Sequence, residues 1–283
     1  MLWLTAAVAL VLVDRSLMAL RWIDLLVALT PGSRPPFRRV LRIFFVSSFV
    51  SNFVPSVAAD MYRAYALARC DVHLAESTAS VLMDRVLGVL SMVIVGACAL
   101  PFARDLGMAR GLMLALSIAF AACAVAGLIV FSERASAAFV RLMNLVPLGI
   151  VRRAAESLTE AVRRYSHHHA ALARVLVMSI AVQAIRVIQA WCLGEALGIE
   201  LPLTVYFAAI PVILLIMQVP VTINGLGTTQ VAFVTLLGAS GADAAPATAL
   251  SLLFLALGVI GSLPGGVIYA FADEAERHGA QPS

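Results

Sequence analysis

Seven charged residues lie in stretches of this chain that are otherwise apolar enough for a membrane interior. They are Asp14, Arg15, Asp60, Arg63, Asp84, Arg85 and Arg186. A charge at the centre of a bilayer costs about 2.5–3.5 kcal/mol on insertion scales, so such residues indicate functional sites by default. Arginine holds phosphates and carboxylates through two parallel hydrogen bonds, and aspartate can balance the arginine when no anion is bound. The set therefore predicts a site for an anionic lipid head group, with a structural charge network between helices as the alternative.

The spacing of these residues indicates where their partners lie. Asp60 and Arg63 are three positions apart, so on a helix they share a face and can pair. Asp14-Arg15 and Asp84-Arg85 are adjacent pairs. Neighbours on a helix point about 100° apart, so each of these four side chains must find its partner on another helix.

Arg21 joins Asp14, Arg15 and Arg186 in the predicted charge network. An alternative stays open for Arg21 and Asp24, because both are near the end of the first apolar stretch. There they could extend their charged ends into the head-group region while their apolar stems stay in the membrane.

Two interruptions of the apolar pattern carry the other candidate residues. Asn52-Phe-Val-Pro55 ends one apolar stretch, and Val219–Gln230 divides the almost uncharged run Leu201–Phe271. A broken backbone at membrane depth is tolerated only where protein or a water-filled cavity satisfies it, and broken helices of this kind form transporter sites. A tight surface loop between two spans is the alternative. The candidate substrate-binding residues are Asn52, Pro55, Asp60, Arg63, Asp84, Arg85, Asn224, Gly225, Gly227, Thr228 and Gln230. A helix beginning near Thr228 would direct its free N–H groups at an anion.

The composition identifies the class of protein. Of the 283 residues, 62% are hydrophobic and only 13% are charged, whereas soluble domains carry about 25% charge. The strands of an outer-membrane barrel would alternate with a period of two, but the apolar runs here are continuous. The expected fold is therefore all-α, a polytopic helical membrane protein.

The expected elements are five full spans and four shorter segments. Two half-length segments around a break indicate a re-entrant hairpin, so two such hairpins are predicted. A kink is expected at Pro264–Gly266. The full spans are 2–29, 74–102, 108–131, 175–197 and 247–271, and the hairpin segments are 37–53 with 56–69 and 203–219 with 228–237.

Arginine-rich loops predict the orientation. Residues 34–42 and 132–173 are basic, whereas 199–202 and 238–246 contain no arginine. We therefore place the first two segments in the cytoplasm and the last two outside, so the first hairpin enters from the cytoplasm and the second from outside. Within the long loop, residues 151–165 alternate apolar and charged positions at helical spacing, which suits an amphipathic helix on an anionic membrane surface.

A shift of 170 residues aligns the two halves of the chain. Residues 75–89 then match 245–259 at seven of fifteen positions, and Pro55 and Asp60 fall on Gly225 and Gln230. Chance identity among residues common in apolar helices is the alternative. We expect one membrane domain over 1–283, with an inverted repeat: repeat 1 at about 2–131, a cytoplasmic amphipathic linker at about 132–173, and repeat 2 at about 174–272.

These stretches resemble the flippase-like membrane domain of lysylphosphatidylglycerol synthases and the stand-alone membrane proteins that share it. The resemblance covers roughly residues 10–272, and two departures from the family pattern stand out. Ala58 and Ala59 replace paired glycines, and Thr229-Gln230 replaces Arg-Glu, so the ion pair of the second hairpin is absent. The motifs that carry the resemblance are Asn52-Phe-Val-Pro55, Asp60 with Arg63, Asp84-Arg85, Pro220–Gln230 and Ser262–Tyr269.

The resemblance and the intramembrane charges together imply a lipid flippase or transporter of the inner membrane, acting on an anionic or polar lipid. Membrane lipids are the expected partners, without nucleic acid, metal or cofactor. The alternatives are a non-catalytic accessory subunit that assists a lipid-synthesis enzyme, and an enzyme of membrane lipid or glycan metabolism. The sequence contains no G-x-S-x-G, H-E-x-x-H or D-x-D motif, so catalysis is not expected. The aminoacyl-transfer domain of the synthases is also missing from it, so lysine transfer is not expected either.

Overall fold

The fold is known from a computed structural model that describes most of the chain. The described residues are 2–30, 36–54, 56–69, 72–104, 156–157, 160–165, 167–218 and 226–279. They are predominantly helical and contain no strand, so the expected all-α fold is confirmed for the part of the chain that is described. The expected span at 108–131, most of the linker, and Pro55, Asn224 and Gly225 lie outside these residues.

Four long helices form the body of the molecule. They are α1 (Leu2–Leu29), α4 (Leu74–Arg104), α8 (His169–Ala196) and α11 (Ala244–Gly279). Each contains a segment long and apolar enough to cross a membrane, since about 20 apolar residues are needed. The chain is therefore a multi-pass membrane protein.

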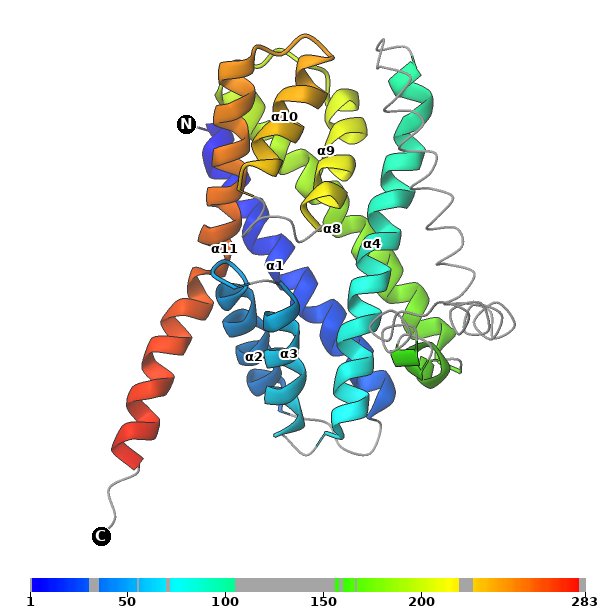
Figure 1. Ribbon diagram of the computed structural model, residues 1–283, viewed down its shortest axis with the longest axis vertical. Helices are drawn as coiled ribbons and strands as arrows, with labels where there is room; N and C mark the ends of the chain where they lie inside the picture. Colours follow the sequence, from blue (N-terminus) through cyan, green and yellow to red (C-terminus); the bar gives the residue numbers. More distant parts are fainter. Residues whose placement is uncertain are drawn as a thin grey trace, which may run out of the picture.

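Four shorter helices pack against this body in two pairs. They are α2 (Phe37–Val50), α3 (Ser56–Ala68), α9 (Leu203–Gln218) and α10 (Thr228–Gly238), with 14, 13, 16 and 11 residues. In Figure 1, α2 and α3 lie side by side in the lower half of the molecule, and α9 and α10 lie together in the upper half. Each of these helices is too short to cross a bilayer alone.

The observed helix bounds lie close to the expected ones, with two differences. Helix α8 begins at His169, six residues before the expected Val175, so it takes in residues assigned to the linker. Helix α11 is also longer than expected, running from Ala244 to Gly279. It contains Pro264 and changes direction part-way along its length (Figure 1), in accord with the expected kink, because proline removes a helical hydrogen bond.

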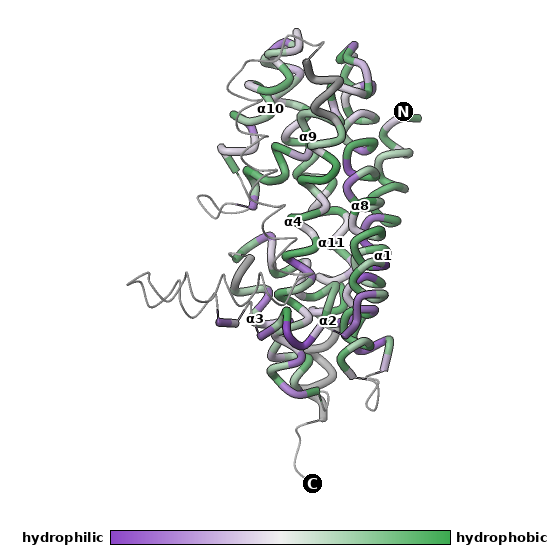
Figure 2. Tube along the Cα trace, turned by 90° about the vertical axis from the view of Figure 1, so that its right-hand side faces the viewer, coloured by the Kyte–Doolittle hydropathy of each residue, from purple (hydrophilic) through white to green (hydrophobic). Residues whose placement is uncertain are grey.

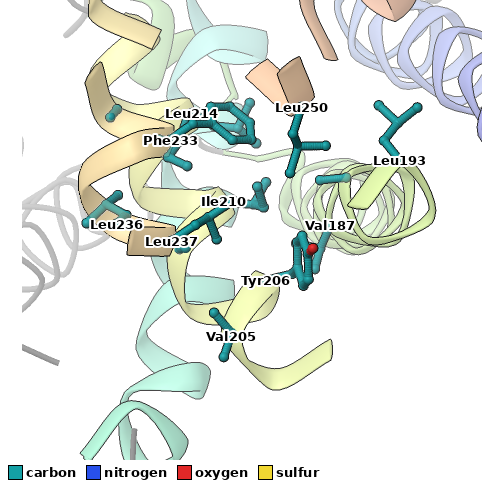
Figure 3. Packing of buried hydrophobic residues seen from close by; sticks show 14 of the residues in the cluster. Val187, Leu193, Val205, Tyr206, Ile210, Leu214, Phe233, Leu236, Leu237 and Leu250 are labelled. Atoms are coloured by element: carbon teal, nitrogen blue, oxygen red, sulfur yellow. The ribbon is translucent and has the colours of Figure 1, made fainter. Parts of the chain in front are cut away.

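The largest hydrophobic cluster joins the upper helices (Figure 3). Tyr206 and Ile210 from α9 and Phe233 from α10 are fully buried there, and side chains of α8 and α11 complete it. Lipid tails are as apolar as these side chains, so close packing rather than exclusion of water is what holds such helices together. This cluster fixes α9 and α10 against α8 and α11.

The lower half of the molecule is more polar. Figure 2 shows hydrophilic residues gathered around α1, α2 and α3, whereas α9 is largely hydrophobic. Helix α4 packs against α3, α8 and α9, and α2 packs against α11. The candidate charged residues therefore fall where α1, α3, α4 and α8 approach one another.

Candidate functional site

A buried carboxylate, Asp84 on α4, is the centre of the first group of charges. It accepts hydrogen bonds from Arg21 Nε of α1 at 2.7 Å and from Arg63 Nη1 of α3 at 3.5 Å. The three side chains are only 6%, 5% and 9% exposed, respectively. We call Arg21, Arg63 and Asp84 the Asp84 cluster. Because all three charged side chains are almost completely buried, removing one of them would leave a partner with an uncompensated charge.

Two serines and two aromatic rings complete the surroundings of the Asp84 cluster. Arg21 Nη1 donates to Ser179 Oγ of α8 at 3.0 Å, and Arg63 Nε donates to Ser47 Oγ of α2 at 3.2 Å. The Arg63 guanidinium also lies 4.9 Å from the ring centre of Trp22 and 5.0 Å from that of Phe44, within the range of cation–π attraction. The cluster thus links α1, α2, α3, α4 and α8 at one point.

A second pair, Asp60 of α3 and Arg85 of α4, is more open. Arg85 Nε donates to Asp60 Oδ2 at 2.8 Å and Arg85 Nη2 donates to Asp60 Oδ1 at 3.0 Å. The remaining nitrogen, Nη1, is 3.5 Å from Oε1 of Gln218, the last residue of α9. The Arg85 side chain is 39% exposed and that of Asp60 is 20% exposed. Arg85 therefore contacts α3, which follows the interruption at Asn52–Pro55, and α9, which precedes the interruption at 219–230.

The expected pairing within α3 is wrong. Asp60 and Arg63 have the spacing of a local pair, but the structure pairs both with α4 instead: Arg63 with Asp84 and Asp60 with Arg85. Arg63 is buried and Asp60 is partly exposed, so the two side chains lie in different environments. The expectation that Asp84 and Arg85 find partners on other helices is confirmed by the same contacts.

A third group surrounds Asp14 in the middle of α1. Asp14 Oδ1 accepts a hydrogen bond from Arg186 Nε of α8 at 3.0 Å. Its neighbour Arg15 points elsewhere, and Arg15 Nη2 donates to the Gly258 carbonyl of α11 at 2.9 Å. As expected for adjacent helical residues, Asp14 and Arg15 have partners on different helices.

The two residues considered for the membrane interface differ in the structure. Arg21 is 4% exposed and belongs to the Asp84 cluster, so the head-group interpretation is wrong for this residue. Asp24 instead pairs with the exposed Arg174 of α8, with Arg174 Nη2 2.9 Å from Asp24 Oδ1. One helical turn therefore separates a buried charge from a superficial one.

Helices α1 and α8 run antiparallel and are joined by a series of polar contacts. The contacts along it are Asp14 with Arg186, Arg21 with Ser179, and Asp24 with Arg174. The first two contacts are seven residues apart on each helix, and the third lies three residues further along α1 and five residues back along α8.

Just beyond these contacts, Tyr165 donates its hydroxyl to the Leu25 carbonyl at 2.8 Å. Burial raises the pKa of the Tyr165 hydroxyl, which keeps it protonated and therefore a donor.

Of the second interruption, 219–230, the described residues are those at its end, where α10 begins. Gly227 has φ +89°, a backbone conformation that residues with a Cβ resist. Its N–H donates to Oε1 of Gln230 at 2.6 Å, so the Gln230 side chain caps the helix. Gln230 thus occupies one of the N–H groups that were expected to face an anion, and its Nε2 is buried without a hydrogen-bond partner among the described residues. Thr228 is partly exposed at the first position of α10.

Asn52 ties the first break to α11. Its side-chain amide donates to Ser262 Oγ at 2.8 Å and to the Phe49 carbonyl at 3.0 Å. The second of these bonds satisfies a carbonyl at the end of α2, and the first holds the turn against α11. Asn52 therefore has a structural role that the sequence did not predict.

Positive charge exceeds negative charge in both groups of ion pairs. The Asp84 cluster and the Asp60–Arg85 pair together hold three arginines and two aspartates. The group on α1 and α8 holds two arginines, Arg15 and Arg186, and one aspartate, Asp14. Each group therefore carries one surplus positive charge among the described residues, which an anion would balance. Over the same residues, no group of three or more His, Cys, Asp or Glu side chains is placed to hold a metal ion.

Residues 1–265 match the family described as Lysylphosphatidylglycerol synthase TM region. The chain belongs to this family. The resemblance drawn from Asn52–Pro55, Asp84-Arg85 and Pro220–Gln230 is thereby confirmed. Neither a curated protein nor a solved structure gives a significant match to the chain.

Proposed function

We propose that this membrane protein translocates lipids with an anionic or polar head group across the inner membrane. The observation that carries the proposal is the position of Arg85. Arg85 is a partly exposed arginine beside the Asp84 cluster, and its guanidinium lies between Asp60 of α3 and Gln218 of α9. Arg85 has a partly exposed guanidinium that contacts α3 and α9, and each of these helices borders one of the two interruptions. Such a group suits the head group of a lipid whose tails stay in the bilayer.

The order of the helices supports an inverted repeat around this site. Helices α1 to α4 begin at residues 2, 37, 56 and 74, and α8 to α11 begin at 169, 203, 228 and 244. Each helix of the second set thus begins 166–172 residues after its counterpart. The short pairs α2–α3 and α9–α10 also occupy opposite ends of the molecule (Figure 1).

The contacts between helices have the same symmetry. Exchanging each helix with its counterpart turns the α4–α9 contact into α11–α2, and α3–α4 into α10–α11, and both members of each pair occur. The α1–α8 contact maps onto itself, as a two-fold axis between these helices requires. Transporters built from such repeats bind their substrate near the midplane, at the broken helices.

The orientation derived from the arginines can be tested by labelling single cysteines. In a background without the four native cysteines, Glu200→Cys lies on the side proposed to be external, and His167→Cys lies on the cytoplasmic side. Both positions are exposed. In intact cells an impermeant maleimide is expected to label position 200 and spare position 167, whereas permeabilised cells should label at both. The opposite pattern in intact cells would contradict the proposed orientation.

The transport proposal is tested with Arg85→Gln in reconstituted vesicles. Removing the guanidinium is expected to slow translocation of a fluorescent phosphatidylglycerol by about tenfold, because one charge-assisted contact to the head group is lost. The rate is measured by quenching the probe in the outer leaflet. Arg174→Gln, which removes an exposed arginine of α8, is the matched control and should retain the full rate. Equal rates for wild type and Arg85→Gln, with equal folded yields, would reject Arg85 as the head-group site.

A further inference from the structure

We infer that the Asp60 carboxylate is an internal competitor for the lipid anion on Arg85, so that a phosphodiester binds by displacing Asp60. The inference deepens the function proposed above and rests on Arg85 being the head-group site. It identifies Asp60 as a residue that sets the affinity for the head group, in addition to any contact it makes with the lipid.

The geometry of the pair is the first reason. Arg85 uses Nε and Nη2 together, at 2.8 Å and 3.0 Å from the two carboxylate oxygens of Asp60. This two-pronged contact is also the way in which a guanidinium holds a phosphate. Asp60 therefore occupies the Nε–Nη2 edge of the guanidinium, and a phosphodiester cannot use that edge while Asp60 is bound there. The third nitrogen, Nη1, makes only the longer contact to Gln218.

The contrast with Asp84 is the second reason. Asp84 is held by two arginines and is almost completely buried, so displacing it would leave a charge without partners in a dry environment, which is strongly unfavourable. Asp60 has one arginine partner, and both members of its pair are partly exposed. Of the two carboxylates beside these arginines, Asp60 is the more exposed, so it can be displaced from its partner at the lower cost.

The competition has a consequence for transport. A carboxylate that returns to Arg85 helps the head group to leave, so Asp60 lowers affinity and speeds release. Removing its charge should tighten binding and, where release limits the cycle, slow turnover. A purely structural role for Asp60 predicts the reverse, because loss of the pair would disorder Arg85 and weaken binding.

The test compares wild type with Asp60→Asn by titrating the purified full-length chain in neutral detergent with dioleoylphosphatidylglycerol. Binding is followed as the rise in the thermal unfolding midpoint. The dissociation constant of Asp60→Asn is expected to be about fivefold lower, equivalent to about 1 kcal/mol. Asp243→Asn removes the same charge at the exposed turn before α11 and should bind like wild type. Adding Arg85→Gln to Asp60→Asn should abolish the gain. Unchanged or weaker binding by Asp60→Asn would overturn the inference.

Further arms separate the sources of the anion and protect against misfolding. Phosphatidylcholine, which has no net charge, should show a smaller gain than phosphatidylglycerol. If sn-glycerol 3-phosphate, which has no acyl chains, shows the full gain, the ligand is a soluble phosphate and the lipid assignment is overturned. If Asp60→Asn folds poorly, Asp60→Ser serves in the same titration, with the same two outcomes. A gain in binding without any translocation by wild type would keep the competition and reject the transport function.

Discussion

Replacing Asp84 with asparagine is expected to lower the free energy of unfolding by about 3–5 kcal/mol, because it leaves two buried arginines without their counter-ion. Arg21 and Arg63 both donate to this carboxylate and both are almost completely buried. Their serine partners, Ser179 and Ser47, are neutral and cannot compensate a charge. The loss should therefore be far larger than for a surface pair, whose contribution is typically small.

The measurement is equilibrium unfolding of the purified protein in mixed micelles, followed by helical circular dichroism. The matched control is Asp24→Asn, which makes the same change in the same kind of ion pair, with the exposed Arg174. Only a small change is expected there, since solvent screens the exposed charge. If Asp84→Asn lost less than about 1 kcal/mol, the surrounding residues would not be as dry as the burial of the cluster indicates.

The second large effect is expected at the crossing of α2 and α11. A methyl group added at Gly265 would overlap the Phe45 carbonyl of α2, which is backbone and cannot rotate away. Gly265→Ala should therefore force the two helices apart and cost about 3 kcal/mol, the upper part of the usual range for an overfilled contact. Glycines in the interfaces of membrane helices allow backbones this close.

The control for this substitution is Gly238→Ala at the end of α10, where an added methyl group meets no atom within 4 Å. Alanine there should leave stability unchanged or raise it by up to about 1 kcal/mol, because glycine is the poorer helix former. Both variants are compared by thermal unfolding in the same detergent. Equal midpoints for Gly265→Ala and wild type would mean that α2 and α11 do not touch at this glycine in the membrane.

The positions of the helices could be predicted because they depend on local features. Long apolar runs become long helices, and proline, glycine or asparagine interrupts them, so the expected segment 37–53 corresponds to α2 and 56–69 to α3. The start of α10 at Thr228 was also predicted, from Gly225 and Gly227 before it. The early start of α8 was missed, because the three histidines at 167–169, two of them just before the helix, resemble a polar turn.

The partners of the charged residues could not be predicted in the same way. Local spacing favoured a pair between Asp60 and Arg63, but burial separates them and α4 supplies a better partner for each. Ser47, Ser179 and Gln218 were missed as members of the site, because a single serine or glutamine in an apolar helix is common. The available signal was that a polar side chain at membrane depth needs a partner, but the sequence does not name that partner when it lies on a distant helix.

The series of polar contacts between α1 and α8 restricts how the molecule can change shape. Sliding one helix past the other by a turn, about 5.4 Å, would break the contacts of Asp14, Arg21 and Asp24 with α8 at the same time. Because all three contacts would be lost together, α1 and α8 should behave as a single rigid unit. Any motion that opens the protein first to one leaflet and then to the other would then have to move α2, α3, α9 and α10 relative to the fixed pair of α1 and α8.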